Sequence, residues 1–131
     1  AALTQAKAAL GRKDPALWRG WVREAEAELL LRQGDAPAAC RAWDEAEAHY
    51  GAAGTPVALA RVLARAAAAQ AAGEPGVAAD RMFRSLRIRV ILQAPILPAE
   101  GGLARGWAEA AGDTGLVAQI DALIPPPAPR P

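Results

Sequence analysis

The sequence predicts an all-α protein built from antiparallel helical hairpins. Hydrophobic residues make up 53 % of the 131 residues, yet aromatics make up only 5 %. Most of the apolar content is alanine, the strongest helix former, whereas the residues that favour strands are few. Glycines followed by an acid recur at Gly34, Gly73 and Gly112, each 39 residues after the one before. Together, these features predict repeated pairs of helices.

Capping residues and prolines mark where the predicted helices begin. The acids that follow the three glycines are Asp35, Glu74 and Asp113. Prolines spaced 19 residues apart, about half of the repeat, are Pro37, Pro56 and Pro75. Proline is favoured in the first turn of a helix, where its missing N–H is not needed. Each repeat therefore predicts two helices of roughly 15 to 18 residues joined by short turns.

Apolar residues recur at helical spacing in the first three predicted helices. The helix over about residues 15–33 carries Leu17, Trp18, Trp21, Val22, Ala25 and Leu29 along one stripe. The helix over about residues 36–51 carries Ala39, Trp43, Ala46 and Tyr50. The helix over about residues 56–72 carries Leu59, Val62, Leu63 and Ala66. We expect these faces to pack together as a core.

The same spacing defines three later helices and an earlier one. The helix over about residues 75–93 carries Ala79, Met82, Phe83, Leu86 and Val90. A shorter helix over about residues 98–111 carries Leu103 and Trp107, and the last, over about 114–124, carries Val117, Ile120 and Ile124. Residues 2–10 have the pattern of the second helix of a preceding hairpin, ended by Gly11.

One predicted helix, over about residues 75–93, is apolar on every side at its end. Ile88, Ile91 and Leu92 fall on the same side as its arginines, so this end should be covered on both faces. The third hairpin could cover it, or a partner or second subunit could. The candidate residues for a second interface are Arg84, Ile88, Ile91 and Leu92.

The repeat resembles the tetratricopeptide (TPR) family, whose tandem αα-hairpins stack into α-solenoids. The residues that match its pattern of a Gly–Asp turn, small residues and a large apolar residue are Gly34, Asp35, Ala39, Trp43 and Ala46. A looser match runs through Gly73, Glu74, Ala78, Met82 and Ser85. The junction between TPR units resembles Ala9–Leu10 followed by Asp14–Pro15.

The resemblance implies a short right-handed TPR-like solenoid over residues 1–124, followed by a Pro-rich tail over residues 125–131. The repeat of 39 exceeds the usual TPR period of about 34, which implies longer helices or turns. The Gly and Tyr expected on the first helix of a unit are replaced by Ala27 and Leu30, and in the next unit by Ala66 and Ala69. A divergent solenoid or a plain helical bundle would account for the same pattern.

The sequence offers little chemistry for catalysis, so we expect no enzyme, no cofactor and no metal site. The chain has one Ser, one His and one Cys. Cys40 and His49 lie nine residues apart, on opposite faces of one predicted helix. We expect Cys40 in the core and His49 beside Glu45 on the surface.

Charge and hydropathy limit the partners of this chain. The net charge is +1, far below the excess typical of a nucleic-acid binder. No run of about 18 residues is apolar and free of charge, so we expect no span of the membrane. The preference for Arg over Lys, with many Ala, Gly and Pro, indicates a bacterial source. A single cysteine is compatible with both periplasm and cytoplasm.

The partner that remains is another protein. In a TPR-like solenoid the first helix of each hairpin lines the concave side. The candidate groove residues are Trp21, Glu24, Glu28, Leu31, Leu63 and Gln70. With an acidic end and small apolar walls, the groove should suit an apolar or basic peptide or helix, and Arg32 should pair with Glu28 in solvent. The chain is thus expected to be a scaffold or adaptor; the alternative is an accessory or regulatory domain of a larger enzyme or transport or secretion system.

Overall fold

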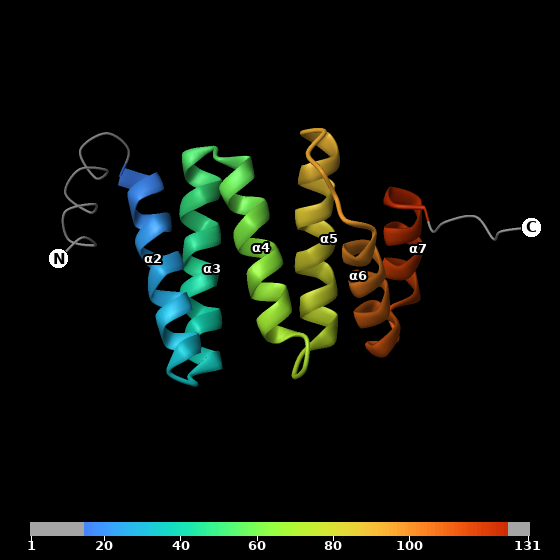
Figure 1. Cartoon of the computed structure of the whole chain (residues 1–131), viewed down its shortest axis with the longest axis horizontal. Helices are drawn as coiled ribbons and strands as arrows, with labels where there is room; N and C mark the ends of the chain where they lie inside the picture. The colour runs from blue at the N-terminus through green and yellow to red at the C-terminus, as the bar shows by residue number, and fades with distance from the viewer. Residues whose placement is uncertain (1–14, 126–131) are drawn as a thin grey trace, which may run out of the picture. The chain divides into compact units, whose positions relative to one another are not determined.

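Six α-helices and no strand make up the part of the chain that the computed structural model describes, residues 15–125 (Figure 1). They are α2 (Pro15–Arg32), α3 (Ala36–Ala53), α4 (Pro56–Gln70), α5 (Pro75–Ile91), α6 (Pro98–Ala110) and α7 (Thr114–Leu123). All six begin where the sequence predicts and end within two residues of the predicted end. The all-α prediction is confirmed for these residues. The helix expected over residues 2–10 and most of the Pro-rich tail lie outside them.

The 39-residue repeat sets where every second helix begins. The first residues of α3, α5 and α7 are Ala36, Pro75 and Thr114, each 39 residues after the one before. The residue before each of them takes the N-cap position, where a side-chain oxygen can accept a hydrogen bond from a free backbone N–H. The repeat therefore places an acid at the same position of three helices.

Asp35 and Asp113 cap their helices with the side chain, whereas Glu74 does not. The Asp35 carboxylate accepts a hydrogen bond from the Ala38 N–H at 3.1 Å, and Asp113 accepts one from the Leu116 N–H at 3.0 Å. Glu74 makes no side-chain capping bond. In front of the two aspartates, Gly34 and Gly112 adopt φ values of +83° and +71°, which favour glycine.

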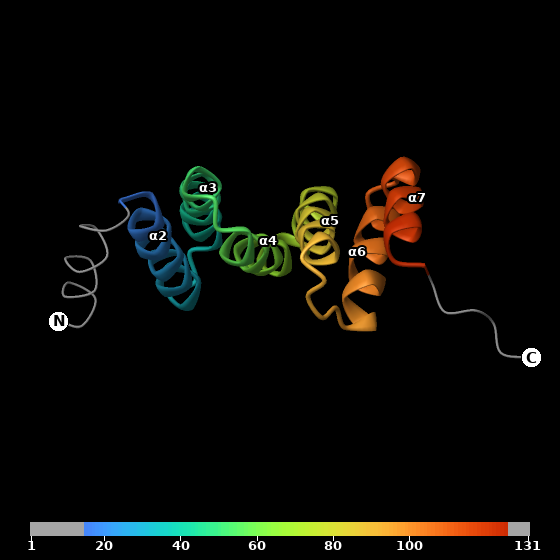
Figure 2. The same ribbon diagram turned by 90° about the horizontal axis from the view of Figure 1, so that it is seen from above.

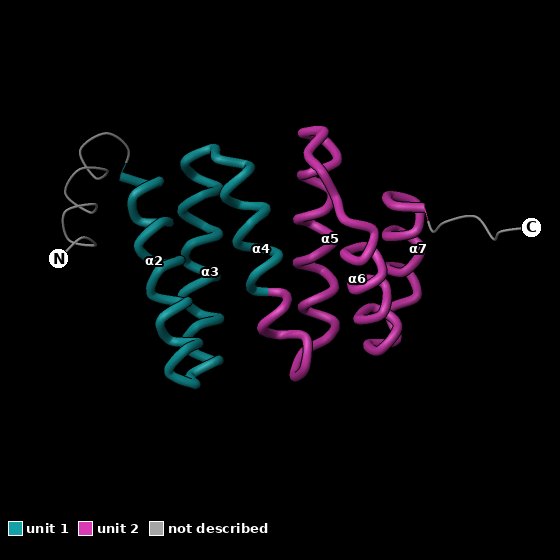
Figure 3. Tube along the Cα trace, viewed as in Figure 1, with its two compact units in different colours: residues 1–66 teal, residues 67–131 magenta. Residues whose placement is uncertain are grey.

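The described residues form two units, divided after Ala66 within α4 (Figure 3). In the first unit, α2 and α3 lie side by side and run in opposite directions (Figure 1). Large side chains that are fully or almost fully buried in this unit are Trp43, Tyr50, Val62 and Leu63. The predicted apolar face of α3 is buried throughout, at Ala39, Trp43, Ala46 and Tyr50.

The core face of α2 differs from the predicted stripe. Its buried residues are Gly20, Val22, Glu24 and Ala27, whereas Leu29 is 55 % exposed. Small residues replace large ones because α3 approaches closely: a Cβ at Gly20 would lie 2.7 Å from Tyr50 Cδ1. The predicted stripe is confirmed at Val22 and wrong at Leu29, because it ranks residues by apolar size, while this helix also packs through glycine, alanine and a carboxylate.

In the second unit, α6 packs against α5 and α7, and α5 also contacts α7 (Figure 2). The buried side chains include Met82, Leu86, Leu116 and Ile120. Ion pairs link neighbouring helices: Arg89 of α5 pairs with Glu100 of α6 at 2.5 Å, and Arg105 of α6 pairs with Asp121 of α7 at 2.9 Å. On α6 the structure buries Ala104 and Ala108, whereas Leu103, predicted to face the core, is exposed.

No helix in the described part of the chain has the length and apolar character needed to cross a membrane.

Candidate functional site

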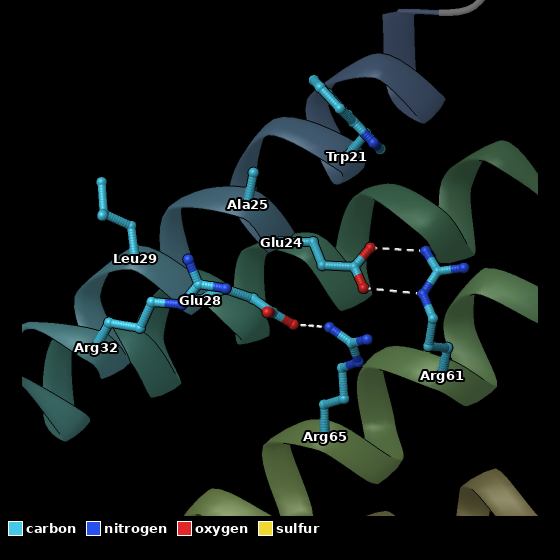
Figure 4. Close-up of a pocket in the computed structure, with 8 residues that line it drawn as sticks. All are labelled: Trp21, Glu24, Ala25, Glu28, Leu29, Arg32, Arg61 and Arg65. Carbon is cyan, nitrogen blue, oxygen red and sulfur yellow. Dashed lines mark hydrogen bonds and ion pairs between the residues drawn. The ribbon is translucent and has the colours of Figure 1, made fainter. Parts of the chain in front are cut away.

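An open pocket with a volume of about 550 Å³ lies in the first unit, on the side where α2 faces α4 (Figure 4). Its lining residues are Trp21, Glu24, Ala25, Glu28, Leu29, Arg32, Arg61 and Arg65. The first six come from α2 and the last two from α4. In Figure 4 the two carboxylates point toward guanidinium groups across the pocket, and the apolar side chains follow the neighbouring stripe of α2.

Glu24 forms the most buried part of the pocket and connects three helices. Its side chain, on α2, accepts a hydrogen bond from the Tyr50 hydroxyl of α3 at 2.7 Å. Arg61 of α4 donates to both carboxylate oxygens, from Nε at 2.9 Å and from Nη2 at 2.7 Å. Two-pronged Arg–carboxylate pairing of this kind is strong and fixes orientation. The buried carboxylate is therefore fully engaged with its own chain.

The surroundings of Glu24 set its charge state. Burial by itself would raise the pKa of this carboxyl, but the hydrogen bonds from Arg61 and Tyr50 and the positive charge of Arg61 outweigh that effect. The pKa of Glu24 consequently lies below its usual value of 4.5. Burial, together with the same contact, raises the pKa of Tyr50, so the hydroxyl stays a donor. Glu24 is thus an anion held by three hydrogen bonds from two side chains.

Glu28, one turn further along α2, pairs with Arg65 of α4. The expected solvent pair between Glu28 and Arg32 is absent from the described residues, because the structure brings Arg65 to Glu28 instead. Both partners are partly exposed, so this pair contributes little stability, on the order of 0 to 1 kcal/mol. Its effect is to remove the free negative charge that the sequence predicts in the groove.

The apolar wall of the pocket comes from Trp21, Ala25 and Leu29, which repeat every four residues along α2. The sequence pattern predicts that these residues belong to the core stripe. In the structure, Leu29 is more than half exposed and Trp21 is only partly buried. An exposed row of this kind on a helix is a surface onto which another apolar side chain can pack.

The structure brings three of the six predicted groove residues together in the pocket: Trp21, Glu24 and Glu28. Leu31 is 42 % exposed but does not line it, and Leu63 is fully buried in the core and presents no surface. Gln70 belongs to the second unit and is not part of this pocket. The six residues therefore do not make one surface.

Sequence reasoning missed Arg61 and Arg65, although a signal was present. Two acids four residues apart on one predicted helix, Glu24 and Glu28, match two arginines four residues apart on another. Equal spacing of opposite charges allows two helices to form a ladder of ion pairs. The match in spacing is therefore a signal, within the sequence itself, that α4 faces α2.

At the candidate second interface, the structure leaves the end of α5 uncovered. Arg84 and Ile88 are partly buried, but Ile91 is 74 % exposed and Leu92 is also exposed. Of the two coverings that the sequence leaves open, the third hairpin does contact α5 through α6, but Ile91 and Leu92 stay exposed. Large apolar side chains exposed between residues 90 and 97 are Val90, Ile91, Leu92 and Leu97.

Other reactive side chains are dispersed. Cys40 is only partly buried, which differs from the core position expected. Glu45, the expected neighbour of His49, pairs with Arg23 of α2 at 2.6 Å. Among residues 15–125, no three His, Cys, Asp or Glu side chains come together in a way that could hold a metal ion.

No protein-family model, curated protein or solved structure matches this chain.

Proposed function

We propose that this chain is a non-enzymatic protein-interaction module, a TPR-like scaffold or adaptor that holds a peptide or helix of a partner protein. The observation that carries the proposal is the pocket of the first unit, with its partly exposed apolar row on α2 beside a line of charges. On such a surface, apolar groups that a partner can pack against give affinity, and the charged groups beside them fix the orientation of the partner. The 39-residue spacing of helix starts supports the repeat architecture.

The internal pairing of the pocket also favours binding over chemistry. Glu24 is anchored by Arg61 and Tyr50, and Glu28 is paired with Arg65. A general base needs a proton within reach and a carboxylate free to take it. Here both carboxylates are already paired with side chains of their own chain, so these groups are positioned before any partner arrives. Side chains that are positioned in advance lower the entropy cost of binding.

The test is affinity capture with the full chain and two matched variants. Leu29→Gln places an amide in the apolar row, and Val57→Gln makes the same kind of change at an exposed position of α4 outside the pocket. Both side chains are more than half exposed, at 55 % and 69 %, so both variants should fold. The expected result is a partner captured by the unaltered chain and by Val57→Gln, and lost with Leu29→Gln. A partner retained by both variants would place the binding surface elsewhere.

The alternative function, an accessory or regulatory domain that packs against a larger protein, draws on the second unit. Four large apolar side chains are exposed within the eight residues from Val90 to Leu97. Exposed apolar clusters of this kind commonly mark surfaces that another domain covers. If this alternative holds, Ile91→Gln removes the captured partner, whereas Leu29→Gln does not.

A further inference from the structure

The charge of the pocket is opposite to the one that the acids on α2 suggest. Three arginines face two glutamates, which leaves one positive charge in excess. Each glutamate is already bonded to an arginine of α4. Arg32 makes no ion pair or side-chain hydrogen bond among residues 15–125. A basic ligand would have to displace an internal arginine to reach a carboxylate.

The arginines, in contrast, keep donors for a ligand. A guanidinium carries five N–H donors, and the bonds to Glu24 use two of those on Arg61. The side chains of Arg61 and Arg65 are 44 % and 50 % exposed, and Arg32 is exposed as well. An acidic group placed in the pocket therefore finds available donors without breaking any contact. A basic group would be repelled by the excess positive charge of the pocket, so the pocket favours partners that carry negative charge.

We infer that the occupant of this pocket is an amphipathic helix of a partner protein, with acidic residues beside its apolar stripe. The inference rests on the proposed function and names the partner class at the same site. The apolar stripe would pack on Trp21, Ala25 and Leu29, while its acids would face Arg32, Arg61 and Arg65.

The spacing of the apolar row matches the interval between the side chains of a partner helix. Trp21, Ala25 and Leu29 follow one another at one turn each, about 6 Å apart along the axis of α2. A partner helix presents apolar side chains at i, i+4 and i+7 with nearly the same interval. The wall from Trp21 to Arg32 is about 16 Å long, enough for three turns of such a helix.

The experiment is selection of binders from a random 16-residue peptide display library on the full chain. Peptides that also bind Leu29→Gln are removed, so that those remaining depend on the pocket. We expect them to combine Asp and Glu with apolar residues at i, i+3 or i+4, and i+7. Pocket-dependent peptides that are basic, or whose apolar residues alternate as in a strand, would overturn the inference and leave the proposed function standing. If no peptide depends on the pocket, the proposed function fails and the inference fails with it.

A charge-reversal pair then tests the arginines directly. Arg32→Glu reverses the charge of the unpaired arginine, and Arg19→Glu makes the same change on an exposed arginine of α2 outside the pocket. The affinity of a selected acidic peptide, measured by fluorescence anisotropy, should fall roughly tenfold with Arg32→Glu and stay within about twofold with Arg19→Glu. Equal loss in both variants would mean that only the net charge of the protein matters. That result would overturn the assignment of Arg32 as a contact of the acidic peptide. Affinity unchanged from that of the unaltered protein in both variants would overturn it as well.

Discussion

Glu24 connects three helices of the first unit, because it is a buried charge on α2 that side chains of α3 and α4 both contact. Its carboxylate accepts hydrogen bonds from Tyr50 of α3 and Arg61 of α4, so it links both helices to α2. A buried ion pair is costly to build, and it is costlier still to break on one side. Sequence periodicity treats a glutamate as a surface residue, and this one is 7 % exposed.

The pH dependence of stability should report on Glu24. Its folded-state pKa lies below the usual 4.5, so the unfolded chain binds more protons in acid than the folded one does. The stabilisation is complete above 4.5 and is lost as the pH falls through the folded pKa. Urea unfolding followed by circular dichroism should show the unfolding free energy falling with pH in that acid range.

The variant Glu24→Gln separates this effect from general acid sensitivity. It should cost about 1 to 3 kcal/mol near neutral pH and flatten the acid slope. Some slope should remain, because the hydrogen bond from Arg89 also lowers the pKa of Glu100 in the second unit. The matched change Glu45→Gln, at an exposed ion pair with Arg23, is the control for loss of a surface carboxylate and should cost less than about 1 kcal/mol. A slope equal in all three proteins would contradict the role given to Glu24.

At the scale of elements, the contact between α2 and α3 depends on the absence of a side chain at Gly20. A Cβ there would lie 2.7 Å from the Tyr50 ring, and the ring is held by its hydroxyl bond to Glu24. The close approach explains why a glycine is tolerated in the middle of a helix. The same substitution, glycine to alanine, should therefore have opposite effects on stability at Gly20 and at a glycine with free space around it.

Gly20→Ala should destabilise the protein by about 1 to 3 kcal/mol, since overpacking outweighs the better helix propensity of alanine. Gly51→Ala, in α3, should instead stabilise it by up to about 1 kcal/mol, because nothing lies within 4 Å of the added Cβ. Urea midpoints measure both. The packing argument is wrong if the two variants shift the midpoint in the same direction.

The N-cap acids of the repeat, Asp35 and Glu74, can be exchanged for each other to test the capping hydrogen bond. Asp35 bonds the Ala38 N–H, whereas Glu74, one methylene longer, makes no such bond at the corresponding position. Glu74→Asp should therefore add a cap and stabilise the chain by about 0.5 to 1 kcal/mol, and Asp35→Glu should cost a similar amount. Thermal unfolding of the two variants and of the double exchange checks this. Unchanged midpoints would show that the cap hydrogen bonds are not significant here.

At the scale of the whole molecule, the sequence predicted the helices well and the surfaces less well. Glycine, proline and capping residues determine the backbone conformation of their immediate neighbours, so helix starts such as Ala36 and Pro75 can be predicted from a few adjacent residues. Which face of a helix is buried depends on residues distant in sequence. Burial of Glu24 requires Arg61 and Tyr50, and exposure of Leu29 follows because α2 packs on its small face.

The exposed apolar end of α5 gives a prediction about the molecule as a whole. Ile91 contributes to surface and not to packing, so Ile91→Ser should change the unfolding free energy by less than about 0.5 kcal/mol. It should nevertheless reduce concentration-dependent association in sedimentation velocity, because an exposed apolar cluster favours contact between molecules. Leu86→Ser, in the core, is the contrasting control and should cost about 2 to 5 kcal/mol. A large loss of stability with Ile91→Ser would show that the end of α5 is packed.

The placement of the four tryptophans makes the first unit distinguishable by fluorescence after one substitution. Trp18, Trp21 and Trp43 lie in the first unit and Trp107 in the second. Trp43 is 2 % exposed, so its emission belongs to the core, while Trp21 stands at the wall of the pocket. A Trp107→Phe chain would emit from the first unit alone. In that chain, a shift of emission on adding a peptide would report on the first unit, where Trp21 lines the pocket, without any attached dye.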